Sequence, residues 1–249
     1  MLELGISLSE TEKQIVQEIP ATSWFTKVKF ANFVSPASPI DFDQNHEMKK
    51  ALVGEWVKET VRDKKVLDLF SANGAFSFEA ALAGAREVVG LEYDPARVAC
   101  ATRLAEILCK HRPDLALPRF IVGDVYDLHH LAYGPGFDVV LCLGGLYHVA
   151  DPPFILDQIR GITRERLIVQ TAQILPWPVN YGRFELRKPA QQEGWTSIVG
   201  GRGTWHMTAD CFENMLAHAG FEIEENKRPP IWARRKYPWY AASCRIRGE

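Results

Sequence analysis

The stretch KVLDLFSANGAFSFEAALAGAREVVGLEYDP, residues Lys65–Pro95, decides the fold of this 249-residue chain. It predicts an apolar strand, a tight turn, an alanine-rich helix that Gly84 ends, and a second strand. An acid lies at the end of each strand, Asp68 in the first and Glu92 in the second. The turn between the first strand and the helix contains a single glycine, Gly74. A strand, a turn and a helix in this order are typical of nucleotide-binding α/β folds.

Short strands and helices are expected to alternate along most of the chain. The expected strands are Val66–Phe70, Val88–Glu92, Phe120–Gly123, Phe137–Leu143 and Arg166–Thr171. The expected helices are 46–61, 75–83, 95–110, one after Asp151, and one within 208–221. Two last strands, Phe221–Glu225 and Tyr240–Ile246, have no helix between them and should pair antiparallel. The pattern predicts an α/β fold with a Rossmann-like, doubly wound, mostly parallel sheet that ends in an antiparallel strand pair.

Two regions break this alternation. Residues 1–45 are irregular, carry the aromatic residues Trp24 and Phe25, and predict an N-terminal arm or cap. Residues 46–249 then form the main domain. Within it, residues 172–207 are polar and aperiodic, and are too long for an ordinary connection. They predict an inserted lid or binding element.

The bulk composition excludes several classes of protein. The net charge of −2 and the isoelectric point near 6.4 give no electrostatic reason for tight nucleic-acid binding. The sequence has no apolar run near 18 residues and no basic, then apolar start, so neither a membrane span nor a secretory signal is expected. Five scattered cysteines without CxxC spacing predict a cytoplasmic protein rather than a disulfide framework. Histidine spacing predicts no metal site.

The turn itself is unsuited to a dinucleotide. A pyrophosphate needs close approach to the backbone and therefore several glycines, but Phe70 and Ala72 stand where two of them would be. Asp68 would repel a pyrophosphate and attract a cation. Glu92 lies where an acid typically binds ribose hydroxyls. These residues together predict a cationic nucleoside without phosphates.

At this point the sequence resembles the class I S-adenosylmethionine-dependent methyltransferases. Asp68 and Gly74 match the acid and last glycine of that family's first motif, and Glu92 matches its ribose-binding acid. The segment VGDVYDL matches the adenine-binding motif through Asp124, with Asp127 as the alternative, and FDVVLCLGGLYHVADP matches the fourth strand and its loop. The resemblance implies S-adenosyl-L-methionine as cofactor. It implies these cofactor-binding residues: Asp68, Ser71, Asn73, Gly74, Glu92, Tyr93, Asp124, Val125 and Leu143. The alternative for the acids is local capping of turns or helix starts.

The methyl acceptor should approach the loop after the fourth strand. Tyr147 and His148 lie there, and histidine is suited to take a proton from a hydroxyl near neutral pH. The alternative is that His148 only holds its loop. Four residues of the insertion are candidates for substrate binding: Arg183, Trp195, Arg202 and His206.

The segments GGLYHVADPPFILDQIRGIT and TWHMTADCFENMLAHAGF are similar to one subgroup of this family. The subgroup includes the tRNA wobble-uridine alkylating enzyme and methyltransferases of small metabolites. We therefore expect in-line O-methylation of a small-molecule acceptor, with a tRNA-modifying methyltransferase as the less favoured alternative. A nicotinamide-dependent oxidoreductase on the same type of sheet is a third hypothesis.

Overall fold

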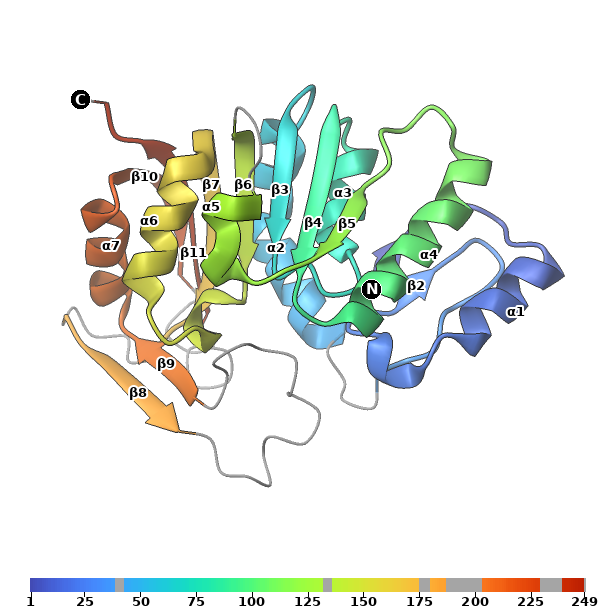
Figure 1. Ribbon diagram of the computed structural model, residues 1–249, viewed down its shortest axis with the longest axis horizontal. Coiled ribbons are helices and arrows are strands. Elements are labelled where there is room, and N and C mark those ends of the chain that lie inside the picture. The colour runs from blue at the N-terminus through green and yellow to red at the C-terminus, as the bar shows by residue number, and fades with distance from the viewer. Residues whose placement is uncertain (39–42, 132–135, 175–179, 187–202, 229–238, 249) are drawn as a thin grey trace. The chain divides into compact units, whose positions relative to one another are not determined.

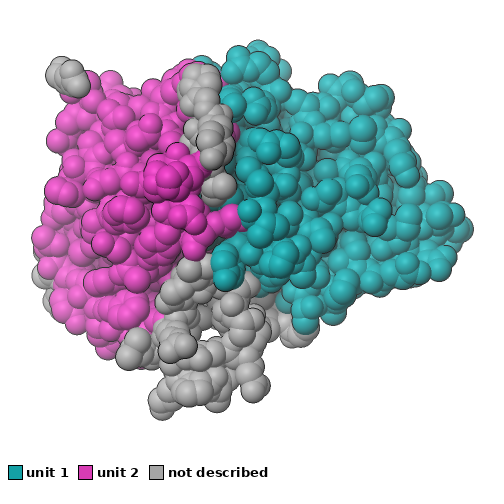
Figure 2. Space-filling view, viewed as in Figure 1, with its two compact units in different colours: residues 1–122 teal, residues 123–249 magenta. Residues whose placement is uncertain are grey.

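The computed structural model describes residues 1–38, 43–131, 136–174, 180–186, 203–228 and 239–248 (Figure 1). It divides into two compact units, Met1–Val122 and Gly123–Glu249, which Figure 2 shows in teal and magenta. Within the described ranges, no helix has the length and apolar character that a membrane crossing requires.

The sheet strands of unit 1 are all parallel and lie in the order β3-β4-β5. Their bounds are Lys65–Leu69 for β3, Glu87–Glu92 for β4 and Arg119–Val122 for β5. The helices α2 (Asp43–Thr60), α3 (Ala75–Leu82) and α4 (Pro95–His111) agree with the predicted ranges. Since parallel strands end at one edge, the ends of β3 and β4 bring the turn and Glu92 together. The apolar character of Phe120–Gly123 predicts a buried strand. This prediction was wrong for β5, because its end residues are exposed and, among the described residues, it pairs only with β4.

The N-terminal segment is more ordered than expected. It contains β1 (Leu2–Glu3), helix α1 (Glu10–Glu18), the short helix η1 (Ala21–Ser23) and β2 (Val28–Lys29), which pairs parallel with β1. Helix α1 begins with a capping box, in which Ser9 and Glu12 bond each other's backbone N–H groups. The expectation of an irregular segment was therefore wrong for α1. The domain boundary at residue 45 stays a prediction.

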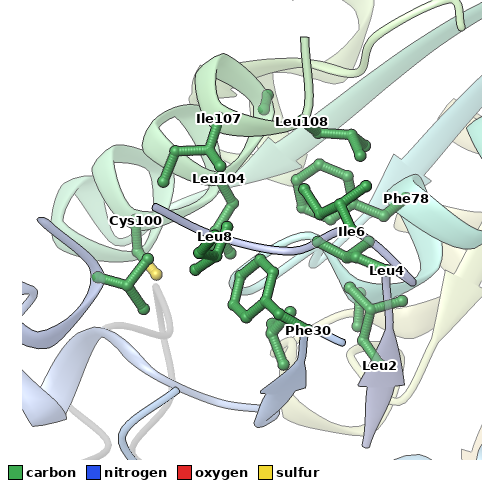
Figure 3. Packing of buried hydrophobic residues seen from close by; sticks show 14 of the residues in the cluster. Leu2, Leu4, Ile6, Leu8, Phe30, Phe78, Cys100, Leu104, Ile107 and Leu108 are labelled. Carbon is green, nitrogen blue, oxygen red and sulfur yellow. The ribbon is translucent and has the colours of Figure 1, made fainter. Parts of the chain in front are cut away.

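An apolar cluster attaches this segment to the rest of unit 1 (Figure 3). Its buried members from the N-terminal segment are Leu2, Leu4, Ile6, Leu8, Val16, Trp24, Val28 and Phe30. They pack against Phe78 of α3 and against the inward face of α4, which presents Leu104, Ile107 and Leu108. Burial of this many apolar side chains makes the segment part of the core of unit 1.

The sheet strands of unit 2 lie in the order β10-β11-β7-β6. The fully buried β6 (Phe137–Leu143) pairs parallel with β7 (Thr163–Ala172), while β11 (Trp239–Ile246) pairs antiparallel with β7 and with β10 (Phe221–Lys227). The helices are η2 (Val125–Asp127), α5 (Leu128–Leu131), η3 (Leu146–His148), α6 (Pro152–Ile162) and α7 (Ala209–His218). The predicted α/β, mostly parallel sheet with a terminal antiparallel pair is confirmed.

The predicted insertion at 172–207 contains a hairpin that periodicity did not reveal. Strand β8 (Gly182–Leu186) pairs antiparallel with β9 (Gly203–Met207), and Gln173 bridges to Met207. Two of the predicted substrate residues, Trp195 and Arg202, lie outside the described residues. The role of the insertion as a lid stays a prediction.

Candidate functional site

Asp68 is the most deeply buried acid of the predicted cofactor set. It lies near the end of β3 with 2% of its surface exposed, and its Oδ2 accepts a hydrogen bond of 2.6 Å from the Ser77 hydroxyl. Burial raises the pKa of Asp68 to about 7, although the Ser77 bond and the charge of Lys49 act in the opposite direction. The carboxyl group therefore titrates near neutral pH and is stabilised as an anion by a neighbouring cation, such as a ligand ammonium.

The turn after β3 contains a buried hydroxyl without a partner. The Ser71 backbone N–H donates to the carbonyl of Leu91, and its carbonyl accepts from Gly74. The Ser71 Oγ is buried and has no hydrogen-bond partner among the described residues. Gly74 is required, since its φ is +83° and a Cβ there would lie 2.5 Å from the Phe120 ring. A buried polar atom without a partner is a natural contact for a bound ligand.

Glu92 completes the site of unit 1 at the end of β4. It is 6% exposed, and its two oxygens accept one backbone N–H each, from Ala72 at 2.9 Å and from Asp94 at 3.1 Å. Burial raises its pKa, while the charge of Arg97 lowers it. Each carboxylate oxygen retains acceptor capacity for a ribose hydroxyl. Tyr93, the next predicted residue, is 45% exposed. Together with Asp68 and Ser71, these groups fit S-adenosylmethionine.

Asn73 is placed differently from the other residues of the turn. Its side chain is 1% exposed and bonds the arm: Oδ1 accepts from the backbone of Phe25 and Thr26, and Nδ2 donates to the Thr26 carbonyl. The side chain is thus occupied by the protein itself. A direct bond to the cofactor, as the resemblance implies, stays a prediction.

Two cations close to this site were missed by sequence reasoning. The Lys49 ammonium lies 5.6 Å and the Arg97 guanidinium 5.7 Å from the centre of the Phe25 ring. The Lys49 charge lowers the pKa of Asp68, and Arg97 also approaches Asp94 at 3.6 Å. The sequence gives no signal for these contacts, because Phe25, Lys49 and Arg97 come from different segments of the chain.

In unit 2, the predicted adenine-binding acid caps a short helix. Asp124 is the N-cap of η2 and accepts from the backbone N–H of Tyr126 at 3.0 Å, as the capping alternative required. Asp127 is exposed, Val125 is 7% exposed and Leu143 is 4% exposed at the end of β6. A cap uses one carboxylate oxygen, so adenine binding by Asp124 remains a prediction that this geometry permits.

The loop after β6 contains Tyr147 and His148 with ring centres 4.1 Å apart. His148 is 4% exposed and its backbone N–H donates to Gly145. The loop continues to Ala150, whose backbone N–H and carbonyl each form a hydrogen bond with a side chain. The Ala150 N–H donates to the Tyr126 hydroxyl at 2.7 Å, and its carbonyl accepts from the Trp205 indole at 3.1 Å. Sequence reasoning missed this pair of positioning contacts.

The β8–β9 hairpin brings together two of the predicted substrate residues. Arg183 and His206 are cross-strand partners, and both contact the Glu185 carboxylate, at 2.7 Å and 3.4 Å. Arg183 is exposed, and His206 is partly buried. Across the described ranges, no group of three or more His, Cys, Asp or Glu side chains is placed to hold a metal ion.

Comparison with known proteins gives the family. Residues 60–198 match the model of a methyltransferase domain. A curated relative, the tRNA U34 carboxymethyltransferase of Trichodesmium erythraeum (strain IMS101), is 25% identical over 188 residues. This alignment covers 70% of the chain but 52% of the relative, so the chain spans about half of that protein's length.

Solved structures share the fold at low sequence identity. The N-terminal domain of EvdMO1, crystallised in the presence of SAH and D-fucose, matches with a TM-score of 0.67 and 16% identity over 98% of both chains. The magnesium protoporphyrin IX methyltransferase ChlM from Synechocystis PCC 6803, with bound SAH, matches with a TM-score of 0.57 and 19% identity. That match covers 82% of this chain and 83% of ChlM. The chain therefore belongs to the methyltransferase domain family and has the fold of the class I S-adenosylmethionine-dependent methyltransferases, as its motifs predicted.

Proposed function

We propose that this protein transfers the methyl group of S-adenosylmethionine to a hydroxyl of a small-molecule acceptor. The observation that carries the cofactor assignment is the arrangement in unit 1. There two buried acids, Asp68 and Glu92, lie next to one turn. The turn contains the Ser71 hydroxyl, which is buried and has no hydrogen-bond partner among the described residues. Two observations argue against a nicotinamide-dependent oxidoreductase. The turn lacks two of the glycines that a pyrophosphate needs for close approach to the backbone, and the chain matches a methyltransferase family.

The cofactor supplies an electrophilic methyl group on a sulfonium, and the residues of the chain bind and orient it. Ionised Asp68 holds the ammonium of the amino-acid part, and Glu92 accepts hydrogen bonds from the ribose hydroxyls. Because both carboxylates are almost fully buried, water competes weakly for them. Asp124 is assigned the adenine amine through the oxygen that does not cap η2. Positioning and exclusion of water then provide most of the catalysis.

His148 is our candidate for the base. A hydroxyl acceptor must lose its proton, and an imidazole is suited to receive it near neutral pH. The Tyr126 and Trp205 contacts to Ala150 fix the loop two residues beyond His148, which supports a precise placement. Arg183 and His206 are proposed to contact the acceptor from the hairpin. We expect the Arg183 guanidinium to bind the acceptor while it stays paired with the Glu185 carboxylate.

A second candidate is a tRNA-modifying methyltransferase. It is favoured by the similarity to the tRNA U34 carboxymethyltransferase, and it is opposed by the net charge of −2, since RNA binding depends on cations that neutralise phosphates. The cytoplasmic location expected from the cysteines stays a prediction.

Transfer of a labelled methyl group separates these candidates. The protein is incubated with methyl-labelled S-adenosylmethionine and with either bulk tRNA or a fraction of small metabolites. We expect label only in the small-molecule fraction, and His148→Ala should abolish that label while SAH binding persists. The control is His129→Ala, which changes an exposed histidine of α5. Label in tRNA that disappears steeply as salt is raised would replace the first candidate by the second.

A further inference from the structure

Three residues of the turn after β3 have positive φ values, which glycine adopts freely, but only one of the three is glycine. The values of φ are +58° at Phe70, +50° at Ala72 and +83° at Gly74. These are the same three positions at which the usual turn of this type carries glycine. A side chain with a Cβ is strained in this region, so Phe70 and Ala72 are held there against their own preference.

Asn73 lies between the strained Ala72 and Gly74 and is tied to the N-terminal segment. Its Oδ1 accepts from the Thr26 N–H at 3.0 Å and from the Phe25 N–H at 3.3 Å, and its Nδ2 donates to the Thr26 carbonyl at 2.8 Å. Asn73 is 1% and Thr26 2% exposed, so little water competes for these bonds. One side chain thereby binds backbone groups of two consecutive residues, which lie 47 and 48 residues earlier in the chain.

The arm at this point is itself fixed. The Phe25 ring makes cation–π contacts with the Lys49 ammonium of α2 and the Arg97 guanidinium of α4, at 5.6 Å and 5.7 Å from its centre. Trp24, the residue before it, is 1% exposed within the apolar cluster that Figure 3 shows in part. Asn73 is therefore bonded to an anchored piece of backbone and not to a loose chain end.

The strained turn determines where the ligand groups lie. The Ala72 N–H, next to Asn73, donates to Glu92 Oε2 at 2.9 Å, and the Ser71 N–H donates to the Leu91 carbonyl at 3.0 Å. A change of φ at Ala72 would move the N–H that orients Glu92. It would also move the buried Ser71 hydroxyl, which has no partner among the described residues.

We propose that Asn73 and the Phe25–Thr26 peptides form a latch that holds this glycine-poor turn in its cofactor-binding conformation. Asn73 is then a positioning residue that acts through Ala72 and Glu92, and the N-terminal arm is required for cofactor binding. The inference rests on the proposed function only for the identity of the ligand.

A double-mutant cycle tests the latch, because a glycine in place of Ala72 removes the strain that the latch opposes. The variants are Asn73→Ala, Ala72→Gly and the double variant, and the readouts are SAH affinity by calorimetry and urea unfolding of the protein without ligand. We expect Asn73→Ala to weaken SAH binding at least tenfold in the natural background. In the Ala72→Gly background, the same substitution should weaken it no more than about threefold. The unfolding midpoints should show the same non-additivity.

Asn32→Ala is the matched control, since Asn32 makes the same kind of paired bonds to Leu8 within the arm, at 2.8 Å and 2.9 Å. It should lower stability without changing SAH affinity, and Ala72→Gly should not alter its effect. If Asn73→Ala does not fold, Asn73→Asp keeps the acceptor, loses the donor to Thr26, and should give a smaller loss that Ala72→Gly again reduces. Equal losses in both backgrounds would overturn the latch, because a direct cofactor contact or a general loss of stability predicts additivity. If the unaltered protein does not bind SAH, the ligand assignment fails, and the unfolding cycle still decides on the latch.

Discussion

The Ser77 hydroxyl donates a hydrogen bond of 2.6 Å to the buried carboxylate of Asp68. Ser77 belongs to α3, the helix that follows the turn, and Asp68 belongs to β3, the strand that precedes it. The contact thus links both sides of the turn. It lowers the pKa of Asp68 while burial raises it, with a result of about 7. The charge of the carboxylate is therefore sensitive to pH in the physiological range.

Cofactor affinity should fall on acidification because of this carboxyl group. Below pH 7 the folded protein holds a proton on Asp68, which must leave before the carboxylate can bind the SAH ammonium. The dissociation constant for SAH should rise up to about tenfold for each pH unit below 7. Ser77→Ala should move the midpoint of this change in affinity to higher pH, because the Ser77 bond lowers the pKa of Asp68. Titration calorimetry between pH 5.5 and 8.5 measures the affinity at each pH. Asp68→Asn, which removes the titrating group, should bind SAH weakly at every pH.

The same group should make the ligand-free protein less stable as pH rises from about 4 to 7. The folded pKa lies above the unfolded value of 3.8, so in this window the folded state holds a proton that the unfolded state has lost. The contribution of Asp68 to the free energy of unfolding is complete below pH 3.8 and is lost by about pH 7. Urea unfolding at several pH values, compared between the unaltered protein and Asp68→Asn, isolates it. An identical pH dependence in both proteins would contradict the raised pKa.

Glu92→Gln should weaken SAH binding about 10- to 100-fold. A glutamine offers one acceptor oxygen, whereas the carboxylate accepts from Ala72 and from Asp94 and retains acceptor capacity for the ribose hydroxyls that we assign to it. The control is Glu87→Gln at the start of the same strand, where the carboxylate is half exposed and pairs with Lys65. Calorimetry on both variants decides the role, and unchanged affinity in Glu92→Gln would refute ribose binding.

Gly74→Ala should destabilise the protein by about 2 to 4 kcal/mol. The new Cβ would lie 2.5 Å from the Phe120 ring and would also be strained by the φ of +83°. Gly5→Ala separates the two effects, because Gly5 has a φ of +66° but, its chain neighbours aside, no described residue has an atom within 4 Å of the added Cβ. It should cost about 1 to 2 kcal/mol. Equal losses by urea unfolding would show that the contact with Phe120 is unimportant.

Trp205→Phe should loosen the hairpin from the loop after β6. The substitution keeps an aromatic ring but removes the indole donor to the Ala150 carbonyl, worth about 0.5 to 1.5 kcal/mol. Amide hydrogen exchange of residues 203–207 should become about 2- to 10-fold faster. Tyr181→Phe serves as the control, since the Tyr181 hydroxyl makes no hydrogen bond with the described part of the chain. Unchanged exchange in Trp205→Phe would remove this contact from the account.

Local sequence signals predicted most strands of the sheet and the two buried acids at the turn, Asp68 and Glu92. The short apolar runs, the Asp94-Pro95 helix start and the shared edge of parallel strands are enough to bring Asp68 and Glu92 to one site. Helix α1 was not predicted, although Ser9 and Glu12 have the capping-box spacing that is typical of a helix start.

The features that escaped prediction depend on contacts between distant segments. Nothing local makes Phe70 or Ala72 adopt a positive φ, and Asn73 meets its partners 47 and 48 residues away. The position of Lys49 and Arg97 around Phe25 likewise depends on packing. The β8–β9 hairpin was missed although its strands alternate, with Arg183, Glu185 and His206 in one polar set and Phe184 against Trp205 in tilted ring contact. Each strand has only five residues, so the alternation is too short to stand out within the long polar insertion.

The central claim is that the turn between β3 and α3 binds a cationic nucleoside without phosphates. Calorimetric titration of the unaltered protein with SAH and, separately, with NADH tests it most directly. We predict saturable one-to-one binding of SAH and no measurable binding of NADH. Binding of NADH without binding of SAH would contradict the account.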